Sequence, residues 1–235
     1  MAIFRVTETA LYTVTELPTL IYLAKKSIDP KDHSTHAAID RVFLLSDGNS
    51  YFAKQEMLKD FQTVRSHHIV SIWAATETAI EQLLVNHITT VGQAPSLIQS
   101  TAPKIRIDSL KRSNSREARK TLRLWESHLP QDSSVERALT MLSTFGIAPL
   151  LPSPDIQRLT EMSEIRNVIM HNGGSLDDTF LKKCPWIDQN PGTKFVISSA
   201  MMESYFNSTQ ALALSFMGKL QTSPHINQTG PSKPG

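Results

Sequence analysis

The chain has very little cysteine, with Cys184 alone among 235 residues. One thiol cannot form an internal disulfide, and it cannot supply a zinc site built from several cysteines. This favours a reducing compartment, and we expect the protein to be cytoplasmic. Apolar residues make up 40% of the sequence, which is an ordinary globular composition and argues against wholesale disorder.

Long hydrophobic runs are lacking as well. The chain does not open on a basic region followed by an apolar stretch, and Glu8 and Glu16 interrupt the apolar residues near the N-terminus. The most apolar late stretch, from Ala200 to Leu220, contains Glu203 and several polar side chains, which is typical of a helix packed on protein. We therefore expect no signal peptide, no membrane-spanning segment and no membrane partner.

Acidic residues are scarce in one part of the chain. The net charge is +2, but between Lys104 and Arg123 eight basic residues accompany two acidic ones, a local charge of +6. Within this stretch Arg116, Arg119, Lys120 and Arg123 are spaced at i, i+3, i+4 and i+7, which puts four cations on one helix face. Such a face can follow the phosphate backbone of RNA, and a basic face that is merely solvated is the alternative.

Hydrophobic periodicity predicts an all-α fold. Apolar residues at helical spacing indicate helices over about 55–90, 115–129, 133–145, from 154 to the glycine pair at 173–174, and 201–220. Residues 41–51 suggest instead a β-hairpin around Asp47-Gly48. We divide the chain into an N-terminal extension of uncertain structure (1–53), a helical bundle domain (54–221) and a polar tail (222–235) whose composition predicts disorder.

Three polar residues stand together on the last turns of the predicted helix that begins near Pro154. Asn167 and His171 are four residues apart, so they share a face, and the amide can orient the imidazole. Arg166 lies roughly 140° around the helix from His171, but its long side chain can reach the same cleft. In a two-fold dimer that packs these helices together, two arginines and two histidines would meet in one pocket.

Such a pocket suits cleavage of RNA by its own 2′-hydroxyl. Histidine titrates near neutrality and can move the protons, while arginine stabilises charge on the phosphate. This chemistry requires no metal ion or other cofactor. The expected products are a 2′,3′-cyclic phosphate and a 5′-hydroxyl, and DNA should be inert because it lacks the 2′-hydroxyl.

The segments Glu164-Ile165-Arg166-Asn167 and His171-Asn172-Gly173-Gly174 resemble those of bacterial HEPN proteins, as does Ser71-Ile72-Trp73-Ala74-Ala75-Thr76-Glu77 upstream. The resemblance covers roughly residues 54–220. It implies an all-helical, usually dimeric protein, and a ribonuclease whose catalytic residues are Arg166, Asn167 and His171. By analogy with such proteins we expect an RNA substrate, a role as a toxin or as a stress or phage-defence effector, and control by an antitoxin or sensor partner.

Two glutamates are candidates to support this site without touching the reacting atoms. Glu77 is expected to hold Arg166 in place, although an acidic residue on the polar side of an amphipathic helix is often simply solvated. Glu164 continues the polar face that Thr160 and Ser163 share with the motif. The pairs of neighbouring histidines in the chain are not joined by a convincing set of carboxylates or thiolates, so we predict no metal site.

Two other interpretations remain open. Arg166 and His171 can serve only to solvate and stabilise a helix C-terminus, where the helix dipole favours cations. The chain can also be a non-catalytic HEPN-like module that binds RNA, a nucleotide or a partner protein, or a structural helical subunit. A catalytic dimer requires that the motif helices of both protomers face a shared, accessible cleft.

Overall fold

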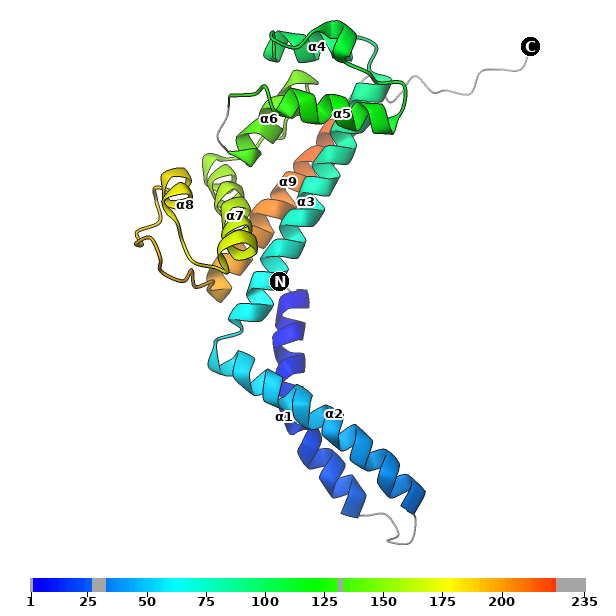
Figure 1. The fold of residues 1–235 in the computed structure, drawn as a ribbon, viewed down its shortest axis with the longest axis vertical. Helices are drawn as coiled ribbons and strands as arrows, with labels where there is room; N and C mark the ends of the chain where they lie inside the picture. The colour runs from blue at the N-terminus through cyan, green and yellow to red at the C-terminus, as the bar shows by residue number, and fades with distance from the viewer. Residues whose placement is uncertain (1, 27–32, 131–132, 223–235) are drawn as a thin grey trace, which may run out of the picture. The chain divides into compact units, whose positions relative to one another are not determined.

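The computed structural model describes residues 2–26, 33–130 and 133–222, and it confirms that the fold is all-α (Figure 1). Every regular element of these residues is a helix, and the single β-type pairing among them is the antiparallel bridge between Ser175 and Lys194. The elements are α1 (Ala2–Lys26), α2 (His33–Leu58), α3 (Gln62–Thr90), α4 (Ala94–Thr101), the 3-10 turn η1 (Ile107–Ser109), α5 (Ser115–Glu126), α6 (Ser134–Thr144), α7 (Ser153–Asn172), α8 (Asp178–Lys183) and α9 (Ser199–Thr222).

The chain divides into two compact units, Met1–His68 and Ile69–Gly235, with the division falling inside α3. In the first unit α1 and α2 pack side by side as an antiparallel pair (Figure 1). The Ser50 hydroxyl donates to the carbonyl of Thr15 at 3.1 Å, and the Lys25 ammonium pairs with Asp40. The N-terminal extension, whose structure the sequence left uncertain, therefore contains a helical hairpin.

The β-hairpin predicted over residues 41–51 is wrong, because this segment lies inside α2. Asp47-Gly48 is a strong local turn signal, but local propensity is a weak prior that packing overrides. Here Ser46 and Ser50 are buried, at 5% and 1% exposure. Packing against α1 keeps these residues helical.

The helix predicted from about residue 55 to 90 is interrupted. α2 ends at Leu58 and α3 begins at Gln62, with Asp60 and Phe61 in between at φ +49° and +57°. These left-handed conformations are uncommon for residues with a side chain, and they turn the chain sharply. Phe61 is nevertheless 4% exposed, so it belongs to the core although it lies in a turn.

Side chains on both sides of this turn hold it in place. The Glu56 carboxylate accepts hydrogen bonds from the amides of Thr63 and Val64 at 3.1 and 3.2 Å. A carboxylate at this position satisfies free amides of the first turn of α3 and complements its positive end. The guanidinium of Arg65, which is 2% exposed, donates to Asp60 at 2.7 Å. The start of α3 is thus set by charged residues that hydrophobic periodicity does not detect.

The second unit is built around α7, which packs against α6, α8 and α9. Leu159, Met162 and Ile165 are at most 1% exposed, which confirms the predicted apolar stripe of this helix. On α9 the side chains of Met202, Tyr205, Leu212 and Phe216 are buried.

Both ends of α7 affect where the motif lies. Ser153 is the first residue of the helix, Pro152 occupies the capping position, and no side chain caps the helix there. At the other end Gly173 has φ +56°, and the amides of Gly173 and Gly174 both donate to the carbonyl of Val168. Such a left-handed glycine is a common way to end a helix, and it fixes the last turn that carries His171.

Among the described residues, no helix is long and apolar enough to cross a membrane. The predicted disordered tail lies outside the described residues, apart from Thr222 at the end of α9.

Candidate functional site

Arg166 lies on α7 with its side chain 30% exposed. Its Nη1 donates to Asn167 Oδ1 at 3.0 Å, and its Nη2 lies 4.0 Å from Glu77 Oε2 on α3. Its Nε is buried and has no hydrogen-bond partner in the described part of the chain. The guanidinium is thus oriented by two neighbours while part of its donor capacity remains unused.

Behind the arginine a chain of polar contacts continues through Asn167 and Glu164. Asn167 Nδ2 donates to Glu164 Oε2 at 3.3 Å, and Lys183 Nζ at the end of α8 donates to Glu164 Oε1 at 3.0 Å. Glu164 is only 4% exposed, so hydrogen bonds from its partners have to replace the water that this carboxylate loses on burial. Glu164 therefore holds the Asn167 amide, which in turn holds Arg166.

His171 lies on the exposed last turn of α7 and makes no hydrogen bond to any described residue. We expected the Asn167 amide to orient its ring, but this amide is engaged with Arg166 and Glu164. The backbone around His171 is nonetheless well held. Asn172 donates to Asp177 at 2.6 Å, and Lys194 donates to the carbonyl of Gly173 at 2.6 Å. The imidazole is therefore open to another molecule.

The predicted basic face lies on α5, where its four cations are exposed. Arg119 donates to Glu81 of α3 at 2.9 Å, and Lys120 donates to Glu117 at 3.0 Å. The hydrogen bond from Lys120 is the main reason why the pKa of Glu117 lies below its usual value. Arg116 and Arg123 form no hydrogen bond or ion pair with any described residue, although Arg116 also helps to lower the pKa of Glu117 through its charge.

A small pocket of about 250 Å³ lies between α3, α5 and α6, and none of the motif residues lines it. Glu77, which contacts Arg166, lines this pocket along with Arg119 and Arg123. Arg116 and Lys120 are not among its lining residues. Glu77 is thus a neighbour of Arg166 and also lines a pocket with two of the four predicted RNA-binding residues.

Sequence reasoning missed that the polar side of α7 is buried. Ser163 is 1% exposed and shares a hydrogen bond of 2.7 Å with Ser134 of α6. Glu161 accepts hydrogen bonds from Trp186 and Tyr205, and burial together with this carboxylate raises the pKa of the Tyr205 hydroxyl. The sequence carries no signal for this burial, because the partners come from α6, α9 and the segment after α8.

The described residues contain no group of three or more histidine, cysteine, aspartate or glutamate side chains arranged to hold a metal ion. The one cysteine is fully buried.

The fold and this site define an all-α helical protein with an arginine and histidine pair on one helix. No protein-family model, curated protein or solved structure matches the chain.

Proposed function

We propose that this protein is a metal-independent endoribonuclease of the HEPN type, whose active site is shared by two copies of the chain. The observation that carries the proposal is the pair formed by Arg166 and His171. The arginine is held by Asn167 and lies within 4.0 Å of Glu77, while the histidine, five residues further along the same helix, is exposed and has no partner among the described residues. One group is positioned to hold a phosphate, and the other is free to move a proton.

The reaction uses the substrate's own 2′-hydroxyl as the nucleophile. One His171 imidazole removes the 2′ proton as this oxygen attacks phosphorus, and the imidazolium formed in this way gives the proton to the departing 5′-oxygen. The Arg166 that completes this site comes from the other copy of the chain. Arg166 stabilises the charge that develops on the phosphate oxygens. The bond from phosphorus to the 5′-oxygen breaks, which leaves a 2′,3′-cyclic phosphate and a 5′-hydroxyl.

The remaining site residues serve this centre indirectly. Asn167 is a positioning residue for Arg166, since both ends of its amide are engaged along the path from Glu164 to the guanidinium. Arg116 and Arg123 are exposed cations without an ion pair among the described residues, and they are suited to the RNA backbone. By analogy alone, such an enzyme acts as a toxin or a phage-defence or stress effector under the control of an antitoxin or sensor.

The first test is incubation of the full chain with total RNA in EDTA, followed by analysis of the fragment ends. We expect cleavage that leaves cyclic phosphate ends and a loss of at least about a hundredfold in His171→Ala, given the usual contribution of general acid–base catalysis. Arg166→Ala should be similarly impaired. His67→Ala, which removes another exposed histidine, is the matched control and should retain full activity. Equal activity of wild type and His171→Ala would refute the mechanism.

The shared site has a test of its own, because Arg166→Ala and His171→Ala damage different halves of it. Mixed dimers of the two variants contain one intact arginine and one intact histidine, contributed by different copies. We expect mixing to restore part of the activity. Sedimentation of the mixture should show a species with the mass of a dimer. If each variant stays inactive after subunit exchange is verified, the site is not built from both copies.

The exposed His171 without an orienting partner also fits a second function, that of a non-catalytic module that binds RNA or a partner protein. A wild type that is folded, dimeric and binds RNA without cutting it would favour this function.

A further inference from the structure

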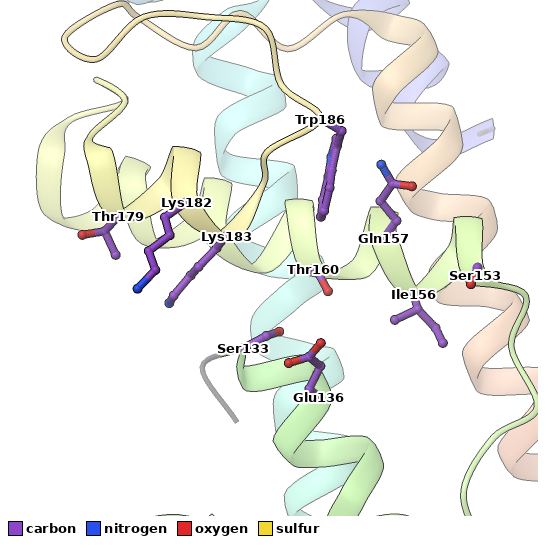
Figure 2. A pocket seen from close by; sticks show the side chains of 10 residues that line it. All are labelled: Ser133, Glu136, Ser153, Ile156, Gln157, Thr160, Thr179, Lys182, Lys183 and Trp186. Atoms are coloured by element: carbon purple, nitrogen blue, oxygen red, sulfur yellow. The ribbon is translucent and has the colours of Figure 1, made fainter. Parts of the chain in front are cut away.

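A larger pocket of about 600 Å³ opens beside the first half of α7, whereas Arg166 and His171 lie in its second half. Figure 2 shows that its walls come from the start of α6, the first half of α7, α8 and the segment that follows α8. The two lysines of α8, Lys182 and Lys183, extend into it from one side, and Trp186 stands along another. None of the motif residues lines this pocket.

Several polar side chains face this pocket without a protein partner. Thr160 is only 8% exposed, yet its hydroxyl makes no hydrogen bond to any described residue, and Figure 2 shows it directed into the cavity. Gln157, Thr179 and Lys182 also line the pocket and have no hydrogen-bond partner within the described chain. The Thr160 oxygen is not one of the fully buried unpaired atoms of the described residues, so it reaches the pocket surface and can bond to a ligand there. This group points to a polar ligand.

The aromatic wall of the pocket is held rigidly. Trp186 is 39% exposed, whereas Trp73 and Trp125, the other tryptophans, are 3% and 0% exposed. Its indole Nε1 donates to the buried Glu161 at 3.0 Å, which fixes the ring. An exposed ring fixed in this way is a suitable stacking surface for a planar base.

The charges around the pocket favour an anion that also carries hydroxyl groups. The Lys183 ammonium is already paired with Glu164 at 3.0 Å, while Lys182 is exposed and unpaired in the described structure. Glu136 of α6 lines the pocket opposite the lysines, so a carboxylate is available to accept hydrogen bonds there. A phosphate near the lysines and a sugar hydroxyl near Glu136 satisfy both groups.

We propose that this pocket binds a ribonucleotide. Its phosphate contacts Lys182 and Lys183, its base lies against Trp186, and Thr160 and Gln157 supply further hydrogen bonds. This binding requires no cleavage, so it holds or fails independently of the proposed ribonuclease activity. A phosphate also competes with Glu164 for Lys183, which connects the pocket with Asn167 and Arg166.

The test is a tryptophan fluorescence titration of the full-length His171→Ala protein with AMP, GMP, CMP and UMP. We expect saturable quenching by at least one nucleotide, and loss of this quenching in Trp186→Phe. Calorimetry should show binding to Lys182→Ala weakened by roughly tenfold or more, because a charge-assisted hydrogen bond to phosphate is lost. Lys104→Ala removes an exposed lysine that does not line the pocket, and it should bind as well as the parent protein.

Three results would overturn the proposal. They are no binding of any of the four nucleotides to folded protein, equal weakening in Lys182→Ala and Lys104→Ala, or binding of inorganic phosphate as tight as that of the nucleotides. When a nucleotide binds as proposed, competition with an uncleavable oligoribonucleotide identifies its source. Displacement supports a pocket for one nucleotide of an RNA strand, and lack of displacement supports a pocket for a free nucleotide.

Discussion

The thiol of Cys184 is fully buried, and its chemistry follows from this burial. Loss of water raises the pKa of the thiol to about 12, and the nearby carboxylates of Glu161 and Glu164 add to the shift. The thiolate is the reactive form of cysteine, so an almost fully protonated thiol is inert. Cys184 therefore belongs to the core beneath the site and has no part in the proposed reaction.

We expect Cys184 in the native protein to resist a thiol reagent at pH 8 and to react fully after denaturation. The unfolded thiol has an ordinary pKa near 9.0, below the folded value. Its contribution to stability is therefore complete below about pH 9 and is lost as the pH rises towards 12. Absorbance titration of the released chromophore checks the reactivity, and rapid native labelling would contradict the burial.

Arg166 shows how a residue's neighbours determine its role. Its partner in the sequence, Asn167, was expected to serve His171, but the buried Glu164 holds the Asn167 amide on the arginine side. Sequence spacing places both Glu164 and His171 within reach of Asn167, so spacing alone does not show which of the two the amide contacts. In the folded chain Lys183 of α8 also binds Glu164, a contact that spacing within one helix does not predict.

At the scale of elements, the end of α7 depends on a glycine that takes a left-handed conformation. Gly173 has φ +56°, whereas Gly218 lies within helix α9, where an added Cβ meets no atom within 4 Å. The first glycine meets a backbone requirement, and the second only weakens its helix.

We therefore expect opposite effects from two alanine substitutions. Gly173→Ala should lower the free energy of unfolding by about 1 kcal/mol, because a Cβ is strained in the left-handed region. Gly218→Ala should raise it by about 0.5–1 kcal/mol, since alanine loses less conformational entropy in a helix. Urea denaturation of both variants measures the difference, and a stabilised Gly173→Ala would contradict the helix end described above.

At the scale of the whole molecule, the cations differ in whether an acidic side chain pairs with them. The chain carries a net charge of +2, but Arg116 and Arg123 form no ion pair with a described residue, while Arg119 is paired with Glu81. An exposed ion pair is weak, yet it still reduces the charge that Arg119 offers to a phosphate. Binding of RNA should therefore depend on these cations unequally.

The salt dependence of RNA binding tests this. In the His171→Ala background, we expect the slope of log affinity against log salt to fall by about 0.7 for Arg116→Gln or Arg123→Gln, the value for one phosphate contact on a single strand. The change for Arg119→Gln should be smaller, since Glu81 already neutralises part of its charge. Fluorescence anisotropy at several salt concentrations gives the slopes. If all three variants keep the slope of the His171→Ala parent, this face is not the RNA contact.

Helical periodicity determined the fold class and most of the second unit in advance. The stripe of Leu159, Met162 and Ile165 repeats at the helical period, and burial of that stripe follows from the hydrophobic effect without knowledge of its partners. The motif of Arg166 and His171 was equally visible, because spacing within one helix is a local property.

Only the tertiary structure decided the features that depend on residues distant in the sequence. The helix break at Asp60 and Phe61 is held by Glu56 and Arg65, and residues 41–51 are helical because they pack against α1. The polar side of α7 is buried because α6, α8 and α9 bring hydrogen-bonding partners to it. The sequence shows which polar groups need hydrogen-bond partners, but only the folded chain brings those partners within hydrogen-bonding distance.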